Sequence, residues 1–212
     1  MDIMPFFVVI GIVGLWVLNF TVSFVNAVGV GLAWTEMSII GGWQKIVTYA
    51  AAIMSGAGFT WCYLIVAMLI TSYFNLLPIE YIEAMVSLGY LIIVFPVLGA
   101  GLAIMINSWA YAIKNKSFVG FGIGAYNTFA QTYNMFSALN AIPDALENVM
   151  ETLFRSHDSD DNGKGFMGLI VILVVVVVTV LGALTTITIV KWVANMDKDK
   201  SVQKIRNVYQ SS

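Results

Sequence analysis

The chain has 212 residues, of which 59% are hydrophobic and only 10% are charged, and its formal net charge is −2. An ordinary soluble domain is about 25% charged, so a soluble protein of this composition would leave too much apolar surface in water. The near-neutral charge gives no reason to expect nucleic-acid binding, and the single cysteine, Cys62, excludes a disulfide within the chain.

The charged residues gather between long apolar runs, which predicts an all-α, polytopic transmembrane helical bundle. Crossing the hydrocarbon core takes roughly 20 apolar residues, and most of the runs are that long or longer. The first run has no basic stretch before it and no clear cleavage pattern after it, so we expect a retained span rather than a signal peptide. In chain order, the predicted spans are 5–28, 46–77, 82–113, 117–141 and 166–190.

Individual spans carry further local signals. The third contains Pro96, which predicts a kink. The fifth contains five consecutive valines at 174–178, and we expect helix there because the backbone in lipid must satisfy its own hydrogen bonds. No Lys, Arg or His lies at the centre of any span, and proton-coupled transport normally needs buried ionisable groups.

The fourth segment, 117–141, differs from the others because it is rich in carboxamides. On a helix, its glycines and amides recur at spacings of four, three, four and three and form one stripe, whereas Phe118, Phe129, Tyr133 and Phe136 lie largely elsewhere. The stripe should face protein or water, either packing against a neighbouring helix or lining an aqueous pore. Its members are Gly120, Gly124, Asn127, Gln131 and Asn134.

Two topologies remain open for this segment. If it crosses, the chain has five spans; if it lies in the interface or re-enters, the chain has four. Lys and Arg accumulate in cytoplasmic loops, and the five-span arrangement places Lys45, Lys114, Lys116 and the basic tail 194–212 on that side. We therefore expect a plasma or inner membrane protein with its N-terminus outside and its C-terminus in the cytoplasm.

The connection 142–165 should be an outer amphipathic helix followed by an acidic loop. Pro143 suits the first turn of that helix, and apolar residues from Ile142 to Phe154 have helical spacing. The loop begins like a calcium-binding loop, with Asp158, Asp160 and Asn162 as candidate ligands. However, the twelfth position, which should be Glu, is Leu169, so a solvated turn competes with a weak metal site.

Two functions fit these features. In the first, the chain self-associates into a homo-oligomer that forms a channel or pore around the stripe. In the alternative, it is a non-conducting structural or sensor subunit of a larger membrane complex, such as a secretion, envelope or defence assembly. Besides the lipid bilayer, the expected partners are therefore further copies or other membrane subunits. The sequence holds no nucleophile elbow or phosphate-binding loop, so we expect neither an enzyme nor a cofactor.

Overall fold

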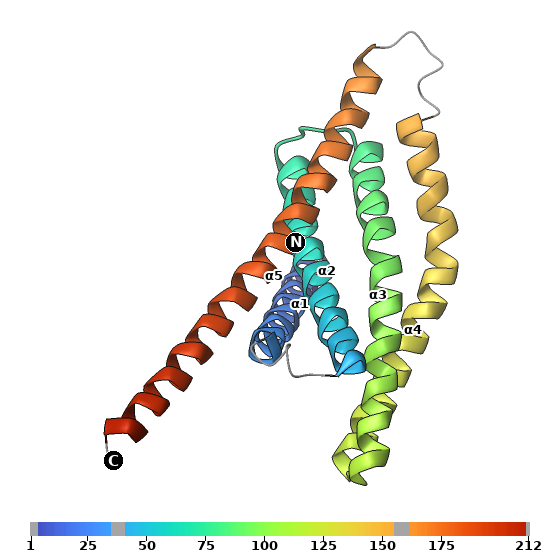
Figure 1. The fold of residues 1–212 in the computed structure, drawn as a ribbon. Coiled ribbons are helices and arrows are strands. Elements are labelled where there is room, and N and C mark those ends of the chain that lie inside the picture. The colour runs from blue at the N-terminus through green and yellow to red at the C-terminus, as the bar shows by residue number, and fades with distance from the viewer. Residues whose placement is uncertain (1–3, 35–40, 155–161, 211–212) are drawn as a thin grey trace.

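The computed structural model describes residues 4–34, 41–154 and 162–210, and the side chains of 10–34, 41–154 and 165–196. This described part is helical, without strands, which confirms the all-α prediction (Figure 1). The helices are α1 (Met4–Trp34), α2 (Gly42–Tyr73), α3 (Ile79–Asn115), α4 (Phe118–Val149) and α5 (Asn162–Gln210), and α4 continues into a π-helical turn, η1 (Met150–Phe154).

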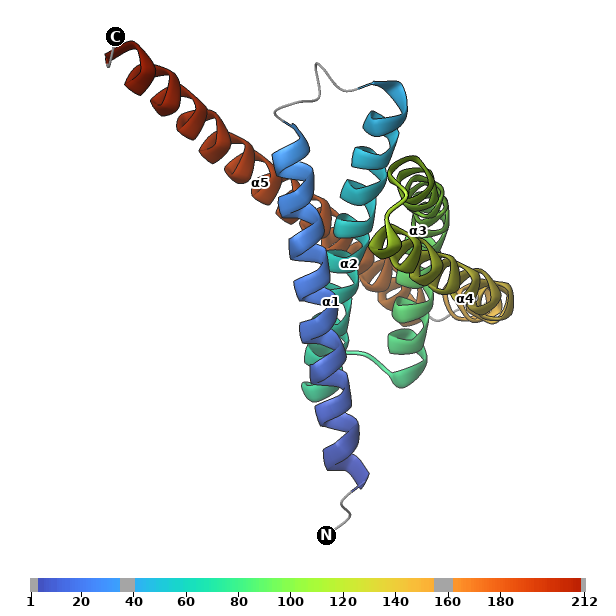
Figure 2. The ribbon, with the colours of Figure 1, turned by 90° about the horizontal axis from the view of Figure 1, so that it is seen from below.

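Consecutive helices run in opposite directions. The rings of Trp34 and Tyr49 meet at one end of the α1–α2 pair, with centroids 6.2 Å apart. In the α2–α3 pair, Leu64 lies against Gly89. Helix α2 packs against α1, α3 and α5, whereas α4 packs on the outside of α3, as Figure 2 shows.

Four helices of the described chain are long and apolar enough to cross a membrane: Ile10–Trp34, Gly42–Tyr73, Ile79–Asn115 and Gly165–Met196. The chain is therefore a multi-pass membrane protein. These four contain the main part of the predicted spans 5–28, 46–77, 82–113 and 166–190. Helix α4, which carries the carboxamide stripe, is not among them.

The region expected as a separate outer helix is instead a continuation of α4. Pro143 lies inside α4 rather than at the start of a new helix, a position that membrane helices tolerate. The predicted apolar face also divides in two: Val149 and Leu153 are buried, whereas Leu146 and Met150 are exposed.

Helix α5 extends well beyond its predicted span. It has 49 residues, which at 1.5 Å per residue is about 70 Å, more than twice the hydrocarbon thickness. The predicted tail 194–212 is thus helical as far as Gln210. Figure 1 shows this C-terminal part of α5 running away from the other helices.

Two kinds of contact join the helices. An apolar cluster unites α2, α3, the end of α4, η1 and α5, and includes Leu64, Met85, Leu153 and Val175. Further along, α2 and α5 approach backbone to backbone at Gly182. A Cβ atom there would lie 2.7 Å from the Thr60 amide nitrogen and 2.8 Å from the Gly56 carbonyl oxygen.

The approach at Gly182 gives a stability prediction. Gly182→Ala should force α2 and α5 apart, because backbone atoms cannot move aside as a flexible side chain can. We expect a clear loss of thermal stability in detergent, measured by the melting of intrinsic tryptophan fluorescence. Gly99→Ala is the matched control, since a Cβ atom at Gly99 meets nothing within 4 Å. Equal melting of the two variants would contradict the close packing of α2 on α5.

Candidate functional site: the polar face of α4 and the central cavity

Helix α4 has two faces of opposite character. Its outward face is apolar and aromatic, with Phe118 92%, Phe129 73% and Tyr133 66% exposed. Its inward face carries the predicted stripe, and Gln131 there is only 3% exposed. An outward face of this kind suits lipid, whereas buried amides need hydrogen-bond partners within the protein.

The two glycines of the stripe let α4 approach α3 closely. A Cβ atom on Gly120 would lie 3.0 Å from Cα of Ala112, and one on Gly124 would lie 3.0 Å from the ring of Trp109. The Ser117 hydroxyl accepts a hydrogen bond from the Gly120 amide at 3.1 Å and caps the start of α4. Small residues thus serve helix packing at this end of the pair.

The next two members of the stripe donate hydrogen bonds to α3. The Asn127 amide donates to the Ser108 hydroxyl at 2.6 Å, and the Gln131 amide donates to the Leu98 carbonyl oxygen at 2.9 Å. A third bond runs the other way, from the Trp109 indole N–H to the Thr128 hydroxyl at 2.8 Å. The structure therefore places Gly120, Gly124, Asn127 and Gln131 against α3 of the same chain.

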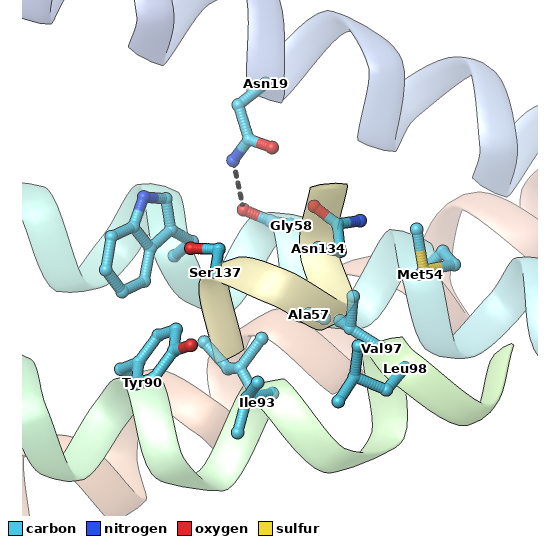
Figure 3. A pocket seen from close by; sticks show the side chains of 12 residues that line it. Asn19, Met54, Ala57, Gly58, Tyr90, Ile93, Val97, Leu98, Asn134 and Ser137 are labelled. Atoms are coloured by element: carbon cyan, nitrogen blue, oxygen red, sulfur yellow. Dashed lines mark hydrogen bonds between the residues drawn. The ribbon is translucent and has the colours of Figure 1, made fainter. Parts of the chain in front are cut away.

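Asn134, the last member of the stripe, lies against a different feature. It lines a cavity of about 340 Å³ that α1, α2, α3 and α4 surround, called the central cavity below (Figure 3). Its lining residues are Asn19, Met54, Ala57, Gly58, Trp61, Tyr90, Ile93, Val94, Val97, Leu98, Asn134 and Ser137. The stripe is thus not one continuous surface: four members pack against α3 and the fifth faces this cavity.

Asn19 connects the central cavity to a hydrogen-bonded junction between α1 and α2. Its amide donates to the Gly58 carbonyl oxygen at 2.9 Å (Figure 3) and lies 3.3 Å from the Cys62 sulfur. The Trp16 indole N–H donates to the Cys62 carbonyl oxygen at 3.1 Å. The only cysteine of the chain is therefore a buried packing residue.

A second polar junction joins α1, α2 and α5. The Ser55 hydroxyl donates to the Ser23 carbonyl oxygen at 2.8 Å and lies 3.1 Å from the Thr186 hydroxyl. The Tyr63 and Thr185 hydroxyls lie 2.8 Å apart nearby. These hydroxyl groups therefore find their hydrogen-bond partners within α1, α2 and α5.

The side chains of the three candidate metal ligands lie outside the part of the chain that the structure describes. Asp158 and Asp160 lie outside the described residues, and Asn162 begins α5, where its side chain is also outside them. Leu169, at the twelfth position of the loop pattern, is a 61% exposed apolar residue of α5. Among the described residues, no group of three His, Cys, Asp or Glu side chains is placed to hold a metal.

Protein-family models, curated proteins and solved structures give no match to this chain. The chemistry of its own residues therefore carries the functional argument. Sequence reasoning identified Asn134, and Asn19 stands out as an amide inside an apolar run. Ser137 and Tyr90, which also line the central cavity, carry no signal in the sequence, because only the packing of α3 and α4 brings them to it.

The buried amide of Gln131 gives a second stability prediction. Gln131→Met keeps the length of the side chain but removes the bond to α3, and a hydrogen bond between membrane helices is worth about 0.6 kcal/mol, up to about 1.7. We expect the free energy of unfolding in bicelles, measured by steric trapping, to fall by an amount in this range. Asn140→Met is the control, because Asn140 is an exposed residue of the same helix. An unchanged value for Gln131→Met would show that the amide does not hold α4 on α3.

Proposed function

We propose that this chain is a five-span, non-conducting subunit of a larger membrane assembly, with a structural or sensory role. The observation that carries the proposal is that the α4 stripe packs against α3 of the same chain, where Asn127 and Gln131 donate hydrogen bonds to α3. Side chains engaged in this way are not free to line a water-filled pore.

The pairing of α4 with α3 supports a crossing by α4. Gly120 lies beside Ala112 near one end of α3, Gln131 bonds to Leu98 midway, and Val149 joins the apolar cluster near the other end. Figures 1 and 2 show the two helices side by side. If α3 spans the bilayer, α4 spans the same depth beside it, and its low hydropathy reflects the amides that α3 covers.

The distribution of charge supports the proposed orientation. At one end of the bundle lie the described side chains of Lys45, Lys114, Lys116 and Lys191, and at the opposite end lie Glu80, Glu83, Asp144, Glu147 and Glu151. Lys164, at the start of α5, belongs to the acidic end. Because basic residues are retained in the cytoplasm, the lysine-rich end and the C-terminal part of α5 should be cytoplasmic, with the N-terminus outside.

The absence of ionisable residues from the spans argues against ion transport by this chain alone. The sequence contains no Asp, Glu, Lys, Arg or His in 46–79, 84–113, 117–143 or 165–190. Pumps and proton-driven carriers normally place such groups inside the bundle. We therefore expect neither transport nor enzymatic activity, and we expect contacts with other subunits through the long cytoplasmic part of α5.

A homo-oligomeric channel is the competing proposal. It would need a polar surface of each copy to face a shared pore. Most of the large exposed side chains of α4 are instead aromatic or aliphatic, a surface suited to lipid or to an apolar neighbour. The exposed polar residues Thr132, Ser137 and Asn140 are scattered among them.

Membrane topology tests the five-span arrangement. In a Cys62→Ala background, single cysteines at Lys116 and Glu147 mark the two ends of α4. We expect a membrane-impermeant maleimide to label the Glu147→Cys variant on intact cells, and the Lys116→Cys variant only after permeabilisation. Labelling of both positions from the same side would show that α4 does not cross, and labelling from the reversed sides would overturn the orientation.

Conductance tests the non-conducting role. The purified chain reconstituted into planar bilayers should give no current above that of lipid alone, while a pore-forming protein in the same membranes gives discrete steps. Reproducible steps that change in size with Asn134→Leu would favour the channel instead.

A further inference from the structure

The central cavity lies at the middle of the membrane-spanning region. Asn19, Gly58, Val97 and Asn134 fall near the midpoints of α1, α2, α3 and α4. Water is scarce at that depth, so a polar side chain there needs a partner. Helix packing accounts for the paired polar side chains elsewhere in the bundle. It does not account for the polar side chains that line this cavity.

Several of these polar groups have no partner within the described protein. The side chains of Asn134, Ser137 and Tyr90 make no hydrogen bond to any described residue. Asn134 and Tyr90 are half-buried, and Ser137 is exposed. Thr128 of the same helix, by contrast, donates to the carbonyl oxygen of Gly124 at 2.9 Å. Figure 3 shows Asn134 and Ser137 of α4 in the region between Asn19 of α1 and Tyr90 of α3.

The arrangement of the helices leaves the cavity open to the side. Helix α4 packs on α3, and within the described residues its Cα atoms stay more than 8 Å from those of α1 and α2. Ser137, which lines the cavity, is exposed at the surface of the bundle, so a molecule dissolved in the bilayer can reach the cavity from that side.

The lining specifies the chemistry of that molecule. No Asp, Glu, Lys, Arg or His lines the cavity, and aliphatic residues from α2 and α3, such as Met54, Ile93 and Val97, make up much of its wall. Its volume of about 340 Å³ falls within the range of small-molecule sites. A charged headgroup would be left unpaired here, whereas a carbonyl or hydroxyl group would find amide and hydroxyl partners.

We propose that the central cavity binds an uncharged amphiphile of the bilayer, which places a carbonyl or hydroxyl group against Asn134 and Ser137 and its apolar part against α2 and α3. Two kinds of membrane molecule carry such a group on an apolar body: a long-chain alcohol and an isoprenoid quinone.

Photo-crosslinking of the full chain in nanodiscs tests the proposal. The probes are a diazirine-bearing hexadecanol, a diazirine-bearing isoprenoid quinone, and a diazirine-bearing palmitic acid as the charged comparison. We expect saturable labelling of the peptides that line the cavity by one or both neutral probes, and weaker labelling by the acid. Whichever neutral probe labels identifies the source. Equal labelling by all three, or labelling spread evenly over the lipid-facing helices, would overturn the site.

Matched variants sharpen the test. Asn134→Leu and Ser137→Ala should each raise the probe concentration needed for half-maximal labelling about threefold to tenfold. This is the loss expected for one hydrogen bond within the membrane. Asn140→Leu, on the exposed surface of α4, should not change it. Because neither Asn134 nor Ser137 bonds to described residues, both variants should melt like the parent chain. Val97→Phe, which fills the cavity, should also reduce labelling.

This inference rests on α4 crossing the bilayer, and the two can fail separately. Absent cavity labelling, with Lys116→Cys and Glu147→Cys still reactive from opposite sides, would overturn the binding site alone. Reactivity of both cysteines from one side would overturn the proposed topology instead.

Discussion

The scarcity of water inside a bilayer is the constraint on which this structure depends. Each polar group at that depth needs a hydrogen-bond partner. The hydrophobic effect, which drives the folding of soluble proteins, does little to join helices that lipid already surrounds. The chain meets this constraint with a few specific bonds, such as Ser55 to the Ser23 carbonyl oxygen and Gln131 to the Leu98 carbonyl oxygen. Glycines beside these bonds, including Gly182 and Gly101, allow the backbones and amides to approach.

The same constraint connects the unusual composition of α4 with its place in the bundle. Asn127 and Gln131 bond to α3, and most of the aromatic rings of α4 are exposed. The hydropathy of α4 is low because it carries these amides. The pairing of α4 with α3 stops at Asn134 and Ser137, which line the central cavity. A ligand in this cavity, rather than another helix, would complete the hydrogen bonding of these two side chains.

Much of the fold was accessible from the sequence, because apolar length and charge position reflect the bilayer directly. The helical class and the apolar spans follow from these two signals. The periodicity of the stripe identified which α4 residues share a face, but not that this face would divide between α3 and the central cavity. Pro143 suggested a new helix where α4 in fact continues, since proline fits both a first turn and the interior of a membrane helix. The cavity itself depends on how four separate helices cross, which no local pattern encodes.

A spin label at Tyr133 tests most directly whether α4 crosses the bilayer with its polar face packed against α3. Tyr133 is 66% exposed near the middle of α4, and its replacement by a labelled cysteine in a Cys62→Ala background leaves the α3 contacts intact. Power-saturation EPR in liposomes should show high accessibility to oxygen and low accessibility to a water-soluble nickel chelate, as expected for a lipid-facing site at mid-depth. High accessibility to the nickel chelate would mean that this face lines water or lies at the membrane surface, which would contradict both the five-span topology and the non-conducting role.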